Sequence, residues 1–307
     1  VLRKSAQPAV CRTNLETMPL RYEQGFFAGF DTKKLFYRLY LPLGGLREKY
    51  TLIILHGHGE HSGRYEKFAA HLQDEEIAIG VFDFRGHGRS QGPRVYIDSF
   101  EEYLRDISCF FDFLNSKHGM ESNGILLGHS LGGLAAVHWA LRFPARLQGL
   151  ILSSPCFGLN IPRFLLAFNS FLNAWAPKFL YQNPVYPPYL THNPEEVEHY
   201  KKDPLIKRKI SVRLLSQMVS YMKNLEKLPR VSFPFPAFVL ASGLEKVVNA
   251  KKTFQFFERL EAPVKEMKVF PDFYHEIFNE LGQEQAFEAL KEAIRIIRNA
   301  AGQEKAD

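Results

Sequence analysis

Short, continuous apolar runs alternate with segments of helical periodicity from residue 52 onward. This alternation limits the fold more than any other feature of the sequence. Strands buried on both faces need apolar residues at every position, whereas half-exposed strands alternate apolar and polar residues. The pattern therefore predicts a mostly parallel sheet with helices on both faces, an α/β architecture. The runs lie at residues 51–57, 77–84, 124–130, 147–155, 237–243 and 264–270.

Two further strand-like runs, residues 22–30 and 33–41, precede this alternation. Only Asp31 and Thr32 lie at the junction between them, as in the turn of a hairpin. The sheet is therefore predicted to begin with a pair of antiparallel strands.

Helices are predicted where apolar residues recur at spacings of three and four. Residues 99–114 show this spacing, and Ser99 with Glu102 forms a capping-box pattern at their start. A second helix near the C-terminus is expected to pack on the sheet through one apolar stripe. That stripe consists of Phe287, Leu290, Ile294 and Ile297.

The regular alternation breaks between residues 157 and 232. This stretch holds a Phe-rich helical segment, a proline-dense segment and a charged helix-like segment, after which the core pattern resumes at Ala237. We therefore expect residues 1–156 and 233–307 to form one core domain and residues 157–232 to form a helical insertion between the sixth and seventh core strands.

Composition and charge exclude several classes of protein. The chain has 307 residues, 46% of them hydrophobic and 23% charged, which is typical of a globular chain rather than a disordered one. The net charge of +6 comes from basic residues that are scattered among acidic ones, so no nucleic-acid partner is expected. The three cysteines have no metal-ligand spacing, and neither a metal nor a cofactor is predicted. The lack of a disulfide framework or a long apolar run predicts a cytoplasmic protein.

The sharpest local motif is Gly128-His129-Ser130-Leu131-Gly132, a G-x-S-x-G element. It directly follows an apolar strand and directly precedes a helix-like segment, which is the setting of a nucleophile elbow. Glycines on either side of the serine let strand and helix backbones approach closely. The motif predicts that Ser130 is a nucleophile; a structural turn is the alternative interpretation.

A serine hydroxyl needs a base, and the base needs an orienting acid. His275 follows the last core strand, which satisfies the chain order Ser, acid, His. Glu245 is the only carboxylate in the loop after the preceding strand, so it is the acid favoured by position. Asp272 and Asp83 remain alternatives.

Ester or amide hydrolysis also requires N–H donors for the tetrahedral oxyanion. The backbone amide of Leu131, directly after the serine, is one candidate. The amide of His58, in the glycine-punctuated loop after the first parallel strand, is the other. Histidines 56, 58 and 61 with Glu60 superficially resemble a metal site, but no second ligand cluster accompanies them. We interpret these side chains as structuring the loop.

Four segments together resemble the alpha/beta-hydrolase family, specifically its monoacylglycerol lipase and lysophospholipase branch. They are HGHGEHSGRY (56–65), FDFRGHGRSQG (82–92), GHSLGG (128–133) and YHEIFNE (274–280). The resemblance spans residues 20–300. It implies Ser130 as nucleophile, His275 as base, the acid at position 245, and an oxyanion hole formed by the amides of His58 and Leu131. It also implies that the insertion at 157–232 is the family's cap.

The sequence departs from the family's pattern at two positions. Glu245 stands where monoacylglycerol lipases have Asp, which looks more like some bacterial lysophospholipases. His58 stands where relatives commonly have a small or apolar residue. The substrate class that the resemblance implies is a monoacyl lipid, either a lysophospholipid or a monoacylglycerol.

The Phe-rich segment of the insertion carries a bulky apolar stripe at helical spacing. Core packing, an acyl-chain path and a membrane-touching face are all open interpretations of such a stripe. Nearby basic residues would suit an anionic head group or an anionic membrane surface. The candidate substrate-binding residues of this stripe are Phe164, Phe168, Phe171 and Trp175.

The favoured function is therefore a serine ester hydrolase that acts on a monoacyl lipid through an acyl-enzyme. One alternative is a peptidase of the proline-iminopeptidase type, which would need acidic cap residues to bind a free amino terminus; Glu195, Glu196 and Glu198 are the candidates. The other is a non-catalytic binding protein on the same fold.

Overall fold

The computed structural model describes residues 21–42, 50–120, 124–183 and 185–303. Its centre is an eight-stranded sheet that is parallel except at one end, where β1 pairs antiparallel with β2 and β2 with β4. Both the antiparallel hairpin and the mostly parallel sheet predicted from the sequence are confirmed. In spatial order the strands are β1 (Arg21–Ala28), β2 (Lys34–Leu41), β4 (Ala78–Phe82), β3 (Thr51–Leu55), β5 (Gly124–His129), β6 (Leu147–Ser153), β10 (Ala237–Ser242) and β12 (Lys265–Phe270).

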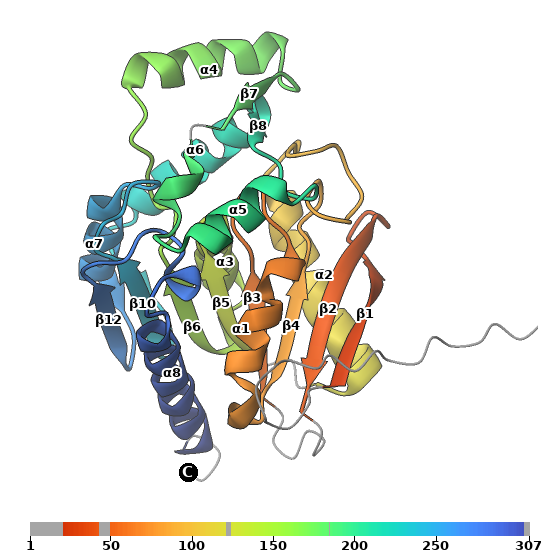
Figure 1. Ribbon diagram of the computed structural model, residues 1–307, viewed down its shortest axis with the longest axis vertical. Coiled ribbons are helices and arrows are strands. Elements are labelled where there is room, and N and C mark those ends of the chain that lie inside the picture. The colour runs from red at the N-terminus through yellow and green to blue at the C-terminus, as the bar shows by residue number, and fades with distance from the viewer. Residues whose placement is uncertain (1–20, 43–49, 121–123, 184, 304–307) are drawn as a thin grey trace, which may run out of the picture.

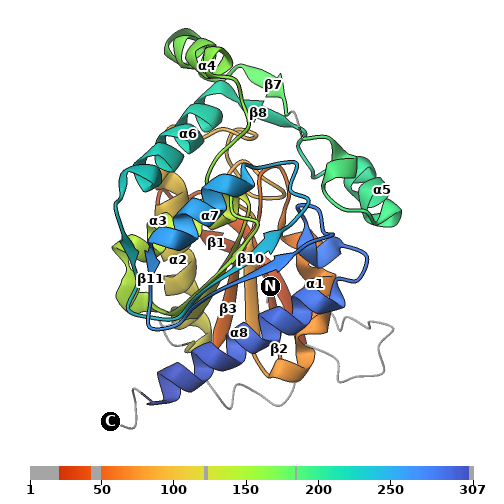
Figure 2. The same ribbon diagram turned by 90° about the vertical axis from the view of Figure 1, so that its left-hand side faces the viewer.

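Helices cover both faces of this sheet (Figure 2). On one face lie α2 (Glu101–His118), α3 (Leu131–Arg142) and α7 (Ala250–Arg259), whereas α1 (Glu66–His71) and α8 (Glu284–Gln303) cover the other. Helix α6 (Val212–Lys227) packs against α3. Successive strand residues point to opposite faces, so Ile53 and Leu55 enter the first core and Leu52 and Ile54 the second. This burial on both faces explains the continuous apolar runs in the sequence.

The two helices predicted in detail are present. Helix α2 begins two residues later than predicted and extends to His118, where Gly119 with φ 60° ends it. Half of the predicted capping box is present: the Glu102 carboxylate accepts the backbone N–H of Ser99 at 2.9 Å, but the Ser99 hydroxyl accepts that of Glu101, at 3.3 Å, instead of that of Glu102. The predicted stripe of α8 packs on the sheet through Phe287, Leu290, Ile294 and Ile297.

Between β6 and β10, the sixth and seventh strands of the sheet along the chain, the polypeptide leaves the sheet. It forms α4 (Arg163–Trp175), β7 (Leu180–Gln182), α5 (Pro194–Lys202), β8 (Lys209–Ser211), α6 and β9 (Val231–Ser232). Strands β7 and β8 form a small antiparallel sheet, and β9 pairs with β11 (Leu260–Glu261). Figure 1 shows α4 at the far end of this segment, away from the main sheet.

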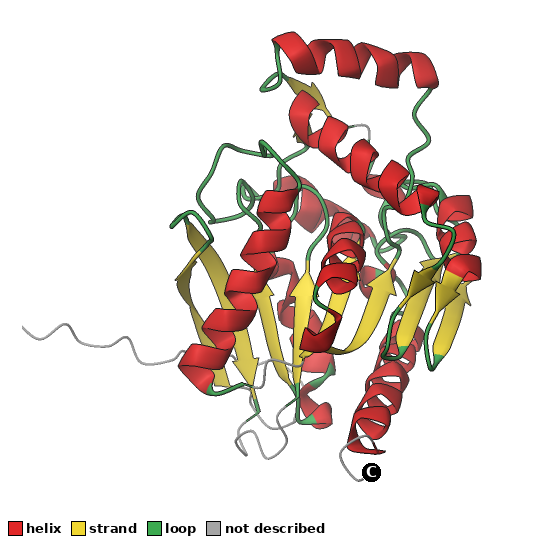
Figure 3. Ribbon diagram, turned by 180° about the vertical axis from the view of Figure 1, so that it is seen from behind, coloured by secondary structure: helices red, strands yellow, loops and turns green. Residues whose placement is uncertain are grey.

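This segment is not an independent unit, because α6 contributes to the main core. Its residues Leu214, Met218 and Leu225 are buried in the same cluster as residues of α3. Figure 3 shows the arrowheads of the parallel strands pointing toward the segment. The carboxyl ends of the strands, where α/β folds hold their sites, therefore face the inserted helices. Short 3-10 helices complete the fold at Ser62–Tyr65, Gln73–Glu75, Pro144–Arg146, Pro187–Tyr189 and Ile277–Asn279.

Candidate active site

Ser130 occupies a strained turn between β5 and α3, with φ 51° and ψ −115°. Non-glycine residues rarely adopt a positive φ, and such strain persists only where the surroundings enforce it. The flanking glycines are required by space: a Cβ at Gly128 would lie 2.5 Å from the Gly132 carbonyl oxygen, and one at Gly132 would lie 2.0 Å from that of Leu55. The strand, turn and helix setting predicted for the motif is therefore present.

His275 and Glu245 meet in the loops that follow β12 and β10. Nδ1 of His275 lies 2.8 Å from Oε2 of Glu245, and both side chains are buried. The other carboxylate oxygen, Oε1, accepts the backbone N–H groups of Val247 at 2.7 Å and Val248 at 3.1 Å. With the carboxylate held by two amides, the Nδ1–H of the imidazole has a fixed acceptor, which leaves Nε2 as the basic nitrogen.

The charge on each partner adjusts the pKa of the other. Burial disfavours protonation of His275, but the Glu245 carboxylate outweighs burial, and the pKa of His275 is raised. Burial likewise acts to raise the pKa of Glu245, but His275 and the two loop amides outweigh it, so that the pKa is lowered. The pair is thus a histidine of increased basicity beside an ionised carboxylate.

Neither of the other two candidate acids lies in this position. Asp83 is buried elsewhere, where its carboxylate accepts the backbone N–H groups of Ser62 at 2.6 Å and Arg89 at 2.8 Å. Asp272 has an exposed side chain. Of the three carboxylates that the sequence leaves open, the structure brings only Glu245 to His275.

The glycine-punctuated loop that carries His58 lies beside the elbow. A Cβ at Gly57 would lie 3.3 Å from Cβ of Ser130, and the Gly57 N–H is held by the Glu60 carboxylate. Leu131 is the first residue of α3, so its N–H is one of the amides that a helix leaves without an intrahelical acceptor. The two predicted oxyanion donors thus come from segments that adjoin Ser130.

The His58 side chain connects this loop to the inserted segment. Its Nε2 lies 3.0 Å from the carbonyl oxygen of Lys209 and therefore carries the proton. Burial lowers the pKa of His58 to about 4, so the ring is neutral near pH 7. Among the described residues, no group of three His, Cys, Asp or Glu side chains is arranged to hold a metal ion.

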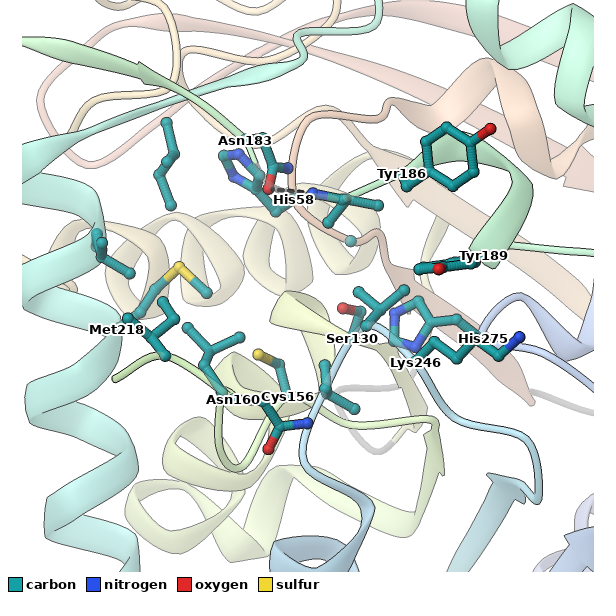
Figure 4. Close-up of a pocket in the computed structure, with 18 of the residues that line it drawn as sticks. His58, Ser130, Cys156, Asn160, Asn183, Tyr186, Tyr189, Met218, Lys246 and His275 are labelled. Carbon is teal, nitrogen blue, oxygen red and sulfur yellow. Dashed lines mark hydrogen bonds between the residues drawn. The ribbon is translucent and has the colours of Figure 1, made fainter. Parts of the chain in front are cut away.

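A cavity of about 490 Å³ opens onto Ser130 and His275 (Figure 4). Loops of the sheet form its floor, and the inserted segment forms much of its wall. A few polar residues line the cavity, among them Asn160, Gln182 and Asn183. Most of the wall is apolar or aromatic, and includes Leu159, Ile161, Leu165, Phe168, Val185, Tyr186, Tyr189, Ile210, Leu215 and Met218. An apolar cavity with few polar groups around a nucleophile is typical of a small-molecule or lipid site.

Comparisons with known proteins find relatives along most of the chain. The family described as "Serine aminopeptidase, S33" matches residues 47–282. The human protein "Monoglyceride lipase" is 30% identical over 257 residues, which cover 82% of this chain and 82% of that protein. The chain belongs to the alpha/beta-hydrolase family. More narrowly, it lies in the branch that contains monoacylglycerol lipases.

Two further relatives of this alpha/beta hydrolase show the extent of the similarity. The crystal structure of the Paleococcus ferrophilus monoacylglycerol lipase superposes with a TM-score of 0.73 at 28% identity, covering 90% of this chain and 98% of that one. "Uncharacterized protein YnbC" of Escherichia coli is 31% identical over 276 residues, or 88% of this chain. The chain spans only 46% of the length of YnbC and 27% of an abhydrolase domain-containing protein of Dictyostelium discoideum.

The structure places only one of the four predicted substrate-binding residues in the cavity wall. Phe168 lines the cavity of this alpha/beta hydrolase. Phe164, Phe171 and Trp175 do not line it, and their side chains are 71%, 63% and 79% exposed. Helix α4 buries only Asn169, which donates to Ser216 Oγ at 2.7 Å, so its apolar stripe lies mainly outside the cavity.

Several wall residues were not identified from the sequence. Leu215 and Met218 lie three apart on α6, in a segment that sequence analysis described only as charged and helix-like. The only signal in the sequence was their spacing, which places both on one face of a helix. Lys246 and Tyr189 also line the cavity. They come from loops in which no periodicity indicates which side chains point inward.

Proposed function

We propose that this chain is a serine ester hydrolase that removes the acyl chain of a monoacyl lipid through an acyl-enzyme intermediate. The observation that carries the proposal is the His275–Glu245 pair beside a strained Ser130 on the wall of an apolar cavity. The similarity to the human monoglyceride lipase supports it.

In this mechanism Nε2 of His275 accepts the Ser130 hydroxyl proton while Oγ attacks the ester carbonyl. The amides of His58 and Leu131 stabilise the negative charge that forms on the carbonyl oxygen. Collapse of the intermediate breaks the ester bond, and His275 gives its proton to the departing alcohol. Water then attacks the acyl-enzyme in the same way and releases the fatty acid, while Glu245 stabilises the imidazolium in both halves.

We also propose that residues 157–232 act as a cap that encloses the acyl chain. The apolar wall residues Leu165, Phe168, Leu215 and Met218 come from this segment, on α4 and α6. Each methylene of acyl chain that such a wall removes from water contributes up to about 0.8 kcal/mol of binding. Specificity is therefore expected to increase with chain length until the cavity is filled.

Replacing Phe168 by alanine tests this path. The variant is expected to lower kcat/KM for long-chain monoacyl lipids more than for short nitrophenyl esters, because only the long chain reaches α4. Phe164→Ala is a matched control, since Phe164 lies on the same helix but outside the cavity. If Phe168→Ala changed both substrate classes equally, the acyl chain would follow another path.

We propose that the exposed face of α4 makes peripheral contact with a membrane surface. Phe164, Phe171 and Trp175 project from it, and the basic residues Arg163 and Lys178 flank it. Large exposed apolar patches of this kind mark interaction sites, and basic residues favour anionic lipids. Within the described residues, no helix has the length and apolarity needed to cross a bilayer.

The double variant Phe171→Ser/Trp175→Ser is expected to weaken cosedimentation with vesicles of a phosphatidylglycerol and phosphatidylcholine mixture by about tenfold or more, since two large apolar side chains are lost. Phe254→Ser, an exposed phenylalanine on α7, is the control. If the double variant and the Phe254→Ser control bound the vesicles equally well, α4 would not be the membrane contact. Hydrolysis of a soluble nitrophenyl ester reports whether the variants are folded.

The peptidase alternative receives less support from the geometry. Glu195, Glu196 and Glu198 belong to α5 and do not line the cavity. Glu196 pairs with Lys67, and Glu198 with Lys201. A site for a free amino terminus needs a carboxylate that faces the cavity, and none of these three residues lines it.

A substrate panel tests the proposed function directly. Monoacylglycerols and lysophospholipids are expected to be hydrolysed with release of fatty acid, and proline amides are expected to be inert. A fluorophosphonate probe is expected to label Ser130, which separates an enzyme from a non-catalytic binding protein of the same fold. Cleavage of proline amides without ester cleavage would establish the peptidase instead.

A further inference from the structure

Lys246 is a cation held at the edge of the cavity by aromatic groups. Its Nζ donates to the Tyr274 hydroxyl at 2.7 Å. The same nitrogen lies 4.3 Å from the centroid of the Tyr274 ring and 4.8 Å from that of Tyr189. These distances are within the range of cation–π attraction. A long, flexible side chain is thus held in one place, which reduces the entropy lost when it binds a ligand.

The positive charge of Lys246 has no carboxylate partner among the described residues. The two buried carboxylates on the cavity wall, Glu60 and Glu276, both pair with Arg64, at 3.0 and 2.6 Å. The Glu245 carboxylate is engaged by His275 and two loop amides. Lys246 is also the only lysine or arginine among the described residues that line the cavity. Its ammonium has three N–H donors, and the tyrosine hydroxyl uses one of them.

The position of Lys246 relative to Ser130 indicates which part of a substrate it would meet. His275 protonates the departing alcohol in the proposed mechanism, so the head group must lie on the His275 side of Ser130. Figure 4 shows Lys246 and His275 together on one side of Ser130, whereas Met218 lies on the opposite side. The apolar wall near Met218 suits the acyl chain, and the region of Lys246 suits the head group.

We propose that Lys246 binds the phosphate of the substrate head group, so that this enzyme prefers lysophospholipids over neutral monoacylglycerols. This inference rests on the proposed ester hydrolase function. An ammonium with free N–H donors forms strong, charge-assisted hydrogen bonds with a phosphodiester. The hydroxyls of a neutral glycerol head group would gain much less from the charge.

The test compares two substrates with the same acyl chain, lysophosphatidylglycerol and 1-monoacylglycerol. Lys246→Met is expected to lower the ratio of their kcat/KM values about tenfold, because the charge-assisted contact is lost. Lys246→Arg is expected to restore most of the ratio. Lys251→Met, which removes the same charge from an exposed position on α7, is expected to keep the wild-type ratio.

Tyr274→Phe provides an independent second variant, since it keeps the ring but removes the hydroxyl that holds Nζ. It is expected to lower the same ratio, though less than Lys246→Met does. Competitive inhibition by glycerol 3-phosphate, weakened in Lys246→Met, would identify the head-group phosphate rather than the fatty-acid carboxylate as the ligand. If Lys246→Met weakened inhibition by free fatty acid but not by glycerol 3-phosphate, Lys246 would bind the fatty-acid product, and the proposal would be wrong.

If Lys246→Met lowered both kcat/KM values equally, the ratio would stay the same and Lys246 would only position the neighbouring Glu245 loop. If neither kcat/KM value changed, Lys246 would not contact the phosphate. Either result overturns this inference while ester hydrolysis itself persists. If the wild-type protein cleaved neither substrate, the proposed function would fail instead. The two failures are therefore distinguishable.

Discussion

Ser130→Ala is expected to lower the turnover of monoacyl lipids and nitrophenyl esters by about 10⁴–10⁶. The substitution removes the oxygen that forms the acyl-enzyme but leaves a Cβ in the strained turn, so the fold should be retained. Turnover of the purified variant and its thermal unfolding midpoint are the two measurements. Labelling by a fluorophosphonate probe should be lost in parallel.

Cys156 is the matched control for this prediction. Its thiol also lines the cavity, and its backbone N–H donates to the Ser130 carbonyl at 3.0 Å. Burial raises the pKa of the Cys156 thiol, which keeps it protonated and weakly nucleophilic. Cys156→Ala is therefore expected to retain most of the turnover. Activity that survived in a folded Ser130→Ala variant but not in Cys156→Ala would reassign the nucleophile.

The sheet and the relative positions of the triad candidates were accessible from the sequence because both depend on short-range patterns. Continuous apolar runs identify strands buried on both faces, and a G-x-S-x-G element between such a strand and a helix locates the turn that carries Ser130. Chain order then points to His275 and to position 245. The structure adds the contact itself, 2.8 Å between His275 Nδ1 and Glu245 Oε2.

The orientation of α4 could not be predicted from the sequence. The stripe of Phe164, Phe168, Phe171 and Trp175 shows that the helix has one apolar face, but periodicity does not reveal what that face meets. In the structure only Phe168 of the four reaches the cavity, because α4 is anchored by Asn169 and lies at the outer end of the inserted segment.

Loop residues show the same limit. Lys246 directly follows Glu245, yet nothing in the sequence indicates that its side chain meets Tyr189 and Tyr274. Glu60, interpreted from the sequence as structuring its loop, does hold the Gly57 amide and also pairs with Arg64. Contacts between loops that are distant along the chain depend on tertiary structure, which local propensity and spacing do not encode.

Glu245→Gln is expected to lower turnover by about 10³–10⁴, because the amide no longer stabilises the imidazolium and can turn its NH₂ toward Nδ1, which favours the wrong tautomer of His275. Asp272→Asn is the control, and its effect should be much smaller, since that side chain is exposed. Glu245→Asp should be intermediate, because the shorter side chain keeps the charge but reaches less far. If Asp272→Asn lowered turnover more than Glu245→Gln does, a carboxylate other than Glu245 would be the acid that orients His275.

The pH dependence of the same variant provides a second, independent readout. His275 must be neutral to accept the Ser130 proton, so kcat/KM should rise with pH through the pKa of His275, and the Glu245 carboxylate holds that pKa above its ordinary value. Removing the carboxylate charge lowers the pKa of His275. The acidic limb of the Glu245→Gln profile should therefore move to lower pH even as the plateau falls. If the acidic limb did not move, a group other than His275 would determine its position. Glu245 would then orient the imidazole without raising its pKa.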